Sequence, residues 1–279
     1  MRLGVMFDRD LPPEQLVPFA KTLDETSVDD LWVVEDLGWT GGVSSAATAL
    51  AVTSRLRVGI GITPAPLRNP MLLAMELANL ARLHPGRLAA GIGHGVGAWM
   101  EQVGAAVPSP LALLEETITS VRALLRGESV TLDGKSVHLD GVTLVHKPAV
   151  PPPVLAGVKG PRSLALSGRV AQGTILPEGV GPDQLPGVVE RIGATEEHEL
   201  VVFAYLRGTA ELDEAAQSLL NGQAEFLGVA PEDVAMASGA AEEAAEWVKS
   251  LWAAGADTVV LRPVGADPLG QVRTLLAAL

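Results

Sequence analysis

Residues 58–70 read VGIGITPAPLRNP and contain the change from strand to helix on which the fold depends. The first half alternates β-branched residues, which favour strands, with glycine, and the second half carries three prolines. Asn69 and Pro70 are typical of a helix start, because asparagine caps the first turn and proline fits the first helical position. Glycine weakens a strand interior, so Gly59 and Gly61 indicate a bulge or the close approach of a ligand or another backbone.

The same strand-then-helix pattern occurs along the whole chain. Apolar runs of strand length are predicted at 2–8, 30–36, 56–62, 87–95, 153–158, 173–178, 198–208 and 257–264. Helical patterns follow them at 13–26, 43–53, 70–84, 111–126, 161–170, 182–192, 211–254 and 268–279. Eight such pairs in 279 residues predict an α/β fold, a (β/α)8 TIM barrel that forms one domain over 1–279. A doubly wound open sheet is the alternative.

One unit of the predicted barrel is longer than the others. The stretch TLDGKSVHLDGVTL at 131–144 contains two Asp-Gly pairs between short alternating segments. Asp-Gly is a preferred turn of β-hairpins, because glycine adopts the positive φ that these turns need. The sequence therefore predicts a small hairpin inserted after the fourth helix.

Composition limits the classes of partner. The formal net charge of −13 argues against nucleic acid and against anionic membrane surfaces, because both require a basic surface. The longest uncharged runs are interrupted by Gly, Ser and Thr, so no membrane span is predicted. The chain has no cysteine, which excludes disulfides and favours the cytoplasm, and no His/Asp/Glu spacing predicts a metal site. A small organic molecule is the expected ligand.

In a TIM barrel the active site is built at the C-terminal ends of the strands. Glycines lie at three consecutive ends, which predicts a flat surface where backbone can contact a planar ligand; ordinary turns are the alternative. The residues expected to contact it are Gly61, Ile62 and Thr63 after the third strand, Gly93, His94 and Gly95 after the fourth, and Gly157 and Val158 after the fifth. Asp8, Trp39 and Glu178 lie at neighbouring ends and are predicted to line a substrate pocket.

Three residues at these ends are candidates for proton transfer. His94 stands between two glycines, where it has no packing role, and a histidine titrates near neutral pH. Glu35 and Asp36 follow one strand, and strand alternation places them on opposite faces, so only one can face the mouth. We predict that this one acts as a general acid or stabilises charge beside the ligand.

The turn Lys159-Gly160-Pro161 predicts an anion site. It joins the fifth strand to a helix that begins at Pro161, so the free N–H groups of the first turn point back to the mouth. Such a helix N-terminus binds phosphate, and Lys159 and Arg162 are available to pair with it. An ordinary strand-to-helix connection is the alternative.

Four motifs occur in an order and spacing that resemble a known family. They are LWVVEDLGWTGG (31–42), RVGIGITPAPLRNP (57–70), RLAAGIGHGVGAWMEQVG (87–104) and VLAGVKGPRSLALSGRVAQGTILPEG (154–179). Together they resemble the luciferase-like monooxygenase superfamily, in particular its coenzyme F420-dependent branch, which includes methylenetetrahydromethanopterin reductase. The resemblance implies an oxidoreductase that binds the deazaflavin across the strand ends and transfers hydride at the exposed ring face. An FMN-dependent monooxygenase or reductase and a non-catalytic flavin-binding barrel are the alternatives.

The resemblance also implies particular features and shows two departures. Relatives carry a third-strand bulge with a non-proline cis peptide behind the ring, and the matching bond here joins Gly61 to Ile62. Deazaflavin-dependent relatives often have Asp-His where this chain has Glu35-Asp36, and some have a glutamate where this chain has Val96. Helices 43–53 and 70–84 are rich in apolar and small residues, and such relatives are commonly dimers, so a homodimer is predicted.

Overall fold

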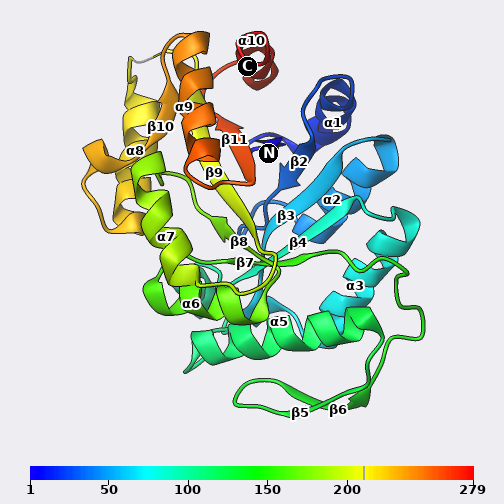
Figure 1. Cartoon of the computed structure of the whole chain (residues 1–279). Helices are drawn as coiled ribbons and strands as arrows, with labels where there is room; N and C mark the ends of the chain where they lie inside the picture. The colour runs from blue at the N-terminus through cyan, green and yellow to red at the C-terminus, as the bar shows by residue number, and fades with distance from the viewer. Residues whose placement is uncertain (210) are drawn as a thin grey trace.

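The described residues form a closed ring of eight parallel strands with helices around its outside (Figure 1). The computed structural model describes residues 1–209 and 211–279. Neighbouring strands pair in parallel, and β8 pairs with β9, which closes the ring. The barrel strands are β1 (Arg2–Met6), β2 (Asp30–Val33), β3 (Arg57–Pro64), β4 (Leu88–Gly93), β7 (Val154–Gly157), β8 (Gly173–Leu176), β9 (Glu199–Arg207) and β11 (Thr258–Pro263). The predicted TIM barrel is confirmed, and the open sheet is wrong.

Helices follow the strands and cover the outside of the ring. They are α1 (Leu16–Asp24), α2 (Gly42–Val52), α3 (Pro70–Leu83), α5 (Pro110–Arg126), α6 (Pro161–Val170), α7 (Leu185–Ile192), α9 (Ala241–Ala253) and α10 (Pro268–Leu276). The predicted hairpin is confirmed, because β5 (Val130–Asp133) and β6 (His138–Val142) pair antiparallel outside α5 (Figure 1). Within the described part of the chain, no helix combines the length and apolarity needed to span a bilayer.

The prediction of one helical region over 211–254 is wrong. This segment contains α8 (Glu214–Leu227), the 3-10 helix η4 (Pro231–Asp233), the strand β10 (Met236–Ser238) and then α9. Gly228 ends α8 with a φ of 75°, and Gly239 has a φ of 102° just before α9, so glycine interrupts the helix twice. β10 pairs with the last residues of β9, beyond the end of β8. The short helix α4 (Gly97–Gln102), which follows β4, is also absent from the prediction.

Two aromatic side chains fill the barrel interior and explain the glycines of β3. Trp32 is fully buried and meets Phe203 edge to face, with ring centroids 5.4 Å apart. A Cβ atom at Gly59 would lie 2.3 Å from the Trp32 ring, and one at Gly61 would lie 2.4 Å from Phe203. Gly4 of β1 faces Trp32 as well, at 3.0 Å. The glycines therefore make room for the core aromatics.

The end of β3 has the irregular geometry that the resemblance implies. The peptide bond between Gly61 and Ile62 is cis, and the pairing of β3 with β4 shifts register over the same stretch. The side chain of Ile62 packs over the ends of β4 and β7, where Cβ atoms at Gly93 and Gly157 would lie 3.0 and 2.3 Å from it. These two glycines thus accommodate the Ile62 side chain within the protein.

An ionic cluster closes the N-terminal end of the barrel. Asp30, which is fully buried, binds Arg2 at 2.5 Å and Arg57 at 2.7 Å. Arg57 also binds Glu199 at 2.6 Å, and the Thr258 hydroxyl donates to the same carboxylate at 2.7 Å. Burial acts to lower the pKa of Arg57, but its bonds to the two carboxylates outweigh burial and raise the pKa overall. Arg57 therefore stays charged and joins β2, β3 and β9 at this end.

The packing of Trp32 against β3 predicts opposite effects for two glycine substitutions. Gly59→Ala should lower the free energy of unfolding by about 1–3 kcal/mol, because the added methyl group overpacks the Trp32 ring. Gly222→Ala should raise it by up to about 1 kcal/mol, because position 222 lies inside α8 with no atom within 4 Å of an added Cβ. Urea denaturation of both variants measures the difference. An unchanged stability for Gly59→Ala would contradict this account of the barrel interior.

Candidate active site

The C-terminal ends of the barrel strands bring the predicted site residues to one mouth. These are Asp8 after β1; Glu35, Asp36 and Trp39 after β2; Gly61, Ile62 and Thr63 in β3; Gly93, His94 and Gly95 at the end of β4; Gly157, Val158, Lys159, Gly160 and Pro161 between β7 and α6; and Glu178 after β8. Gly61 and Ile62 are half-buried, whereas Thr63 is buried. The Gly61–Ile62 peptide thus reaches the open side of the barrel.

A group of buried charges at the mouth is centred on Arg262, at the end of β11. Its Nε donates to Asp8 at 2.5 Å, and its Nη1 donates to Glu178 at 3.3 Å. Arg262 and Glu178 are only 9% and 8% exposed, so this triad lies inside the mouth. The predicted pocket residues Asp8 and Glu178 are therefore brought together, through an arginine that bridges them.

Tyr205 of β9 lies beside this triad and is neutral. Its ring centroid is 5.7 Å from the Arg262 guanidinium, and its hydroxyl donates to Gln223 of α8 at 3.2 Å. Burial, and then the charge of Glu178, raise the pKa of Tyr205 well above its ordinary value of 10.0. Gln223 in turn donates to the Glu178 backbone carbonyl at 2.6 Å. Two hydrogen bonds thus attach α8 to this edge of the mouth.

A second charged group lies on the β2 side. Asp36 pairs with Arg9 at 2.6 Å, and each side chain is about a quarter exposed, at 26% and 27%. The Arg9 guanidinium stacks 4.5 Å from the centroid of Trp39, whose indole N–H donates to Asp10 at 2.9 Å. Trp39 is 45% exposed and lies 6.0 Å, centroid to centroid, from Trp99 of α4. This aromatic pair borders the opening.

Glu35 points away from that group into a structural pair. Its carboxylate binds both terminal nitrogens of Arg68, one of them at 2.9 Å, and accepts the N–H of Gly42 at 2.7 Å. Gly42 is the first residue of α2, so the carboxylate also lies at the positive end of a helix. β2 ends at Val33, and the two acids diverge beyond it. Glu35 is thus held in a structural pair, and a proton-transfer role for Asp36 stays a prediction.

His94 connects two loops of the predicted cofactor surface. Its Nε2 lies 3.1 Å from the hydroxyl of Ser163, in the first turn of α6. Its Nδ1 is buried and has no hydrogen-bond partner among the described residues. Burial lowers the pKa of His94 below 6.5, although the Pro110 carbonyl opposes part of this effect, so the ring is neutral at pH 7. Its role in catalysis or cofactor binding stays a prediction.

The loop between β7 and α6 is only partly available to an anion. Lys159 donates to the backbone carbonyl of Phe226, and its ammonium lies 4.0 Å from the centroid of the Phe226 ring. No side chain caps the N-terminus of α6 at Gly160, so the N–H groups of its first turn keep no intrahelical partner. An anion at this turn would therefore meet backbone donors and the exposed Arg162, while Lys159 holds α8.

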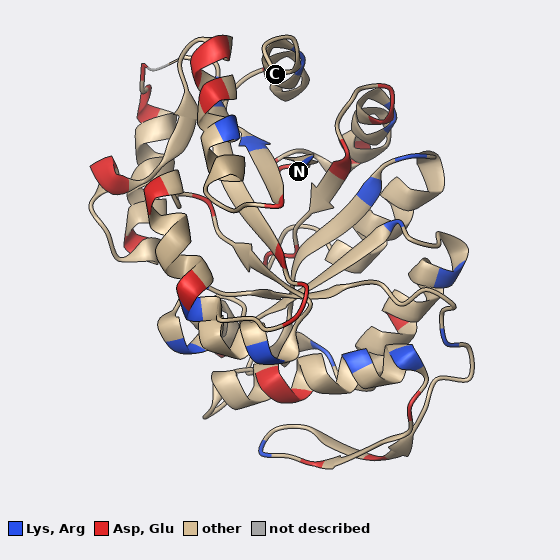
Figure 2. Ribbon diagram, viewed as in Figure 1, with Lys and Arg blue, Asp and Glu red and all other residues tan. Residues whose placement is uncertain are grey.

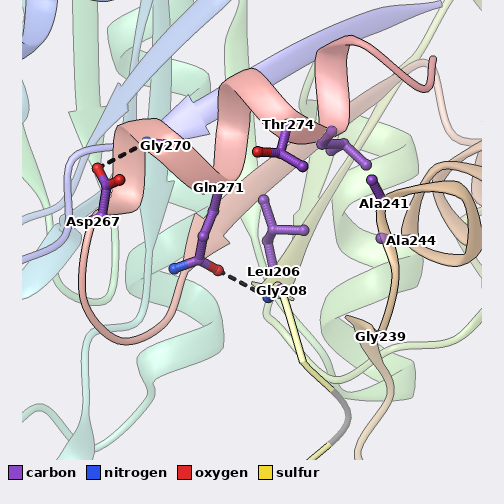
Figure 3. A pocket seen from close by; sticks show the side chains of 10 residues that line it. Leu206, Gly208, Gly239, Ala241, Ala244, Asp267, Gly270, Gln271 and Thr274 are labelled. Atoms are coloured by element: carbon purple, nitrogen blue, oxygen red, sulfur yellow. Dashed lines mark hydrogen bonds between the residues drawn. The ribbon is translucent and has the colours of Figure 1, made fainter.

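A separate cavity of about 300 Å³ lies between the end of β9 and the helices α9 and α10 (Figure 3). Two of its polar side chains are hydrogen-bonded to backbone N–H groups of the lining. Gln271 accepts the N–H of Gly208 at 3.1 Å, and Asp267 accepts the N–H of Gly270 at 3.0 Å. It includes none of the predicted site residues. Among residues 1–209 and 211–279, no group of three or more His, Asp or Glu could hold a metal ion.

Several side chains that define the mouth are not among the site residues predicted from the sequence. They are Arg9, Arg68, Ser163, Gln223 and Arg262. Arg262 carries a signal that is visible in the sequence, because it is a lone charge at the end of the eighth apolar run. Arg68 and Gln223 carry none, because loop and helix geometry bring them to the site.

Most of the chain matches a known protein family. The model of the luciferase-like monooxygenase family matches residues 1–262. The chain belongs to this family. It is 27% identical over 272 residues to a 5,10-methylenetetrahydromethanopterin reductase from Methanolobus tindarius, a match that covers 97% of this chain and 77% of the relative.

Two further known proteins are similar to the chain. It is 31% identical over 196 residues to an F420-dependent glucose-6-phosphate dehydrogenase from Beutenbergia cavernae, covering 65% of this chain and 58% of that protein. The chain thus matches little more than half the length of this relative. A solved F420-dependent secondary alcohol dehydrogenase, in complex with an F420-acetone adduct, shares the fold. It has a TM-score of 0.85 at 18% identity, over 100% of this chain and 98% of its own.

The divergent contacts of the two acids predict different effects on stability. Glu35→Gln should lower the free energy of unfolding by roughly 2 kcal/mol, because Arg68 loses its more buried charged partner and keeps only Glu76, at 3.3 Å. Asp36→Asn should lower it by less than about 1 kcal/mol, because its ion pair is more exposed. Chemical unfolding of the two variants, side by side, measures both changes. A loss for Asp36→Asn as large as that for Glu35→Gln would show that Asp36 is a structural acid as well.

Proposed function

We propose that the protein is an oxidoreductase that uses coenzyme F420 and transfers hydride between this deazaflavin and a small organic substrate. The observation that carries the proposal is the bulged end of β3, whose half-buried Gly61–Ile62 peptide reaches the mouth in a chain of this family. Membership of the luciferase-like family and the F420-dependent relatives support the same cofactor. FMN is the alternative cofactor, and a flavin-binding barrel without activity is the alternative of another class.

The residues of the mouth fit a planar, phosphate-bearing cofactor. Ile62, at the tip of the bulge, offers an apolar surface beside the backbone of β4 and β7. The uncapped first turn of α6 offers backbone N–H donors, with Arg162 beside them, which suits a phosphate group. His94 contributes a buried Nδ1 that lacks a partner among the described residues. The proposed contacts are Gly61, Ile62, Thr63, Gly93, His94, Gly95, Gly157, Val158, Gly160 and Pro161, with Lys159 reaching the site only if it leaves Phe226.

The side chains of the mouth are proposed to have different roles in the reaction. When bound, F420 supplies or accepts a hydride. Asp36, paired with Arg9 and about a quarter exposed, is the acid best placed to exchange a proton with a substrate or with water. Tyr205 keeps its proton at neutral pH and can only donate or accept a hydrogen bond. The aromatic pair Trp39 and Trp99 would contact an apolar part of the substrate on this side.

Anaerobic titration with F420 and, separately, with FMN tests the proposed cofactor. F420 should bind in the micromolar range and more tightly than FMN. Arg162→Glu, at the start of α6, should weaken F420 binding at least tenfold, because it places a negative charge beside the phosphate site. The matched control Arg169→Glu, in the last turn of the same helix, should bind within twofold of the wild type. Tighter binding of FMN would replace F420 in the proposal, and binding of neither would remove it.

We also propose that the protein forms a homodimer through α3. Leu72, Met75 and Leu83 follow one face of this helix and are 57%, 50% and 65% exposed. An exposed apolar face of this kind favours a self-complementary contact. Light scattering at micromolar concentration should give a dimer for the wild type and a monomer for the double variant Leu72→Glu/Met75→Glu. Val189→Glu, on α7, is the control and should stay dimeric; a monomeric wild type would contradict the proposal. The cytoplasmic location stays a prediction.

A further inference from the structure

We propose that Arg262 is a specificity-determining residue that admits an uncharged, oxygen-bearing substrate and excludes phosphorylated or carboxylated ones. The inference rests on the proposed function, in that it takes the barrel mouth as the substrate site. The positive charge of this arginine is already balanced by two carboxylates of the protein, Asp8 and Glu178.

The two carboxylates hold the guanidinium on adjacent sides. Asp8 accepts from Nε at 2.5 Å and Glu178 accepts from Nη1 at 3.3 Å, while the Arg262 side chain is 11% exposed. Nη2 donates to no residue in the described part of the chain and is the nitrogen left for a ligand. Arg262 therefore has its charge neutralised but keeps a donor. Such a group suits a neutral acceptor, for example a carbonyl or hydroxyl oxygen.

The charged groups next to Arg262 are slightly negative as a set. The carboxylates of Asp8, Asp36 and Glu178 and the guanidiniums of Arg9 and Arg262 together carry one net negative charge. Tyr205 adds none, because its hydroxyl stays protonated. The adjoining segment 211–253, which includes α8, carries nine acidic residues and one basic residue, Lys249, and Figure 2 shows the acids along its ribbon.

An anionic substrate that accepts only from Nη2 would lie close to both carboxylates, and one that binds the guanidinium with two oxygens would have to displace a carboxylate from Arg262. The displaced Asp8 or Glu178 would then be a buried charge without its partner, which is strongly unfavourable. The incoming anion would also lie beside the other carboxylate, at a distance where like charges repel each other strongly in a site of low dielectric. A neutral oxygen that accepts from Nη2 avoids both effects, because both ion pairs stay in place.

Removing the two acids should convert Arg262 into an anion site. The variant Asp8→Asn/Glu178→Gln keeps the shape of both side chains but leaves the guanidinium uncompensated. Isothermal titration with inorganic phosphate should give an added site in this variant, at least tenfold tighter than any phosphate binding by the wild type at the mouth. The triple variant with Arg262→Gln should lose the added site. Any phosphate bound at the N-terminus of α6 is common to all three proteins and cancels in the comparison.

A second variant keeps the test decisive if the double variant does not fold. Glu178→Gln alone breaks the longer of the two ion pairs and should tighten phosphate binding at least threefold. No gain in either folded variant, or a gain that survives Arg262→Gln, would overturn the inference. Wild-type protein that already binds phosphate as tightly as the double variant would overturn it too. F420 binding is measured separately, so its absence would remove the proposed function without producing any of these phosphate results.

Discussion

The burial of Trp32 inside the barrel is the constraint on which the rest of the structure depends. An indole is too large for a ring of eight strands unless some positions facing it lack a side chain, and Gly4 and Gly59 meet this need on the two flanking strands. Phe203 then completes the interior from the opposite side and requires glycine at position 61. The composition of β3 is therefore set first by packing.

This packing also shapes the mouth. Around Gly61, which packs against Phe203, the register of β3 against β4 shifts between Ile60 and Thr63. The shift turns Ile62 onto the surface made by Gly93 and Gly157. One set of glycines thus makes room for the aromatic side chains inside the barrel, and a second set makes room for Ile62, the residue proposed to support the cofactor. A substitution in the first set would disturb the second.

The sequence predicts the barrel well because its evidence is local and repeated. Each strand-length run followed by a helical pattern is readable by itself, and the hairpin is visible from its two Asp-Gly turns. The prediction of one helical region over 211–254 is wrong because most residues of this segment favour helix. Their helical periodicity hides the two breaks at Gly228 and Gly239. The mouth is predictable as a location, since strand ends must meet there. The pairing of Asp8 with Arg262 and of Glu35 with Arg68 is not, because it depends on distances across the ring.

The two ends of the barrel contain the same arrangement of charged side chains but differ in how many hydrogen-bond donors stay free in the described part of the chain. At each end an arginine lies between two carboxylates, Arg57 between Asp30 and Glu199, and Arg262 between Asp8 and Glu178. Every terminal nitrogen of Arg57 is bonded to the protein, and its Nη2 reaches both acids and approaches Thr258 at 3.4 Å. Arg262, in contrast, leaves Nη2 without a partner among the described residues.

This difference agrees with the general rule for TIM barrels. Residues at the N-terminal end of the strands contribute to stability, and residues at the C-terminal end form the active site. An arginine whose nitrogens all donate to the protein joins strands, and it cannot bind a ligand without losing one of these hydrogen bonds. An arginine with one free donor joins strands and still offers a hydrogen bond at the mouth. The number of unsatisfied donors, rather than the presence of a buried ion pair, therefore separates the structural cluster at Arg57 from the cluster at Arg262 that is proposed to contact the substrate.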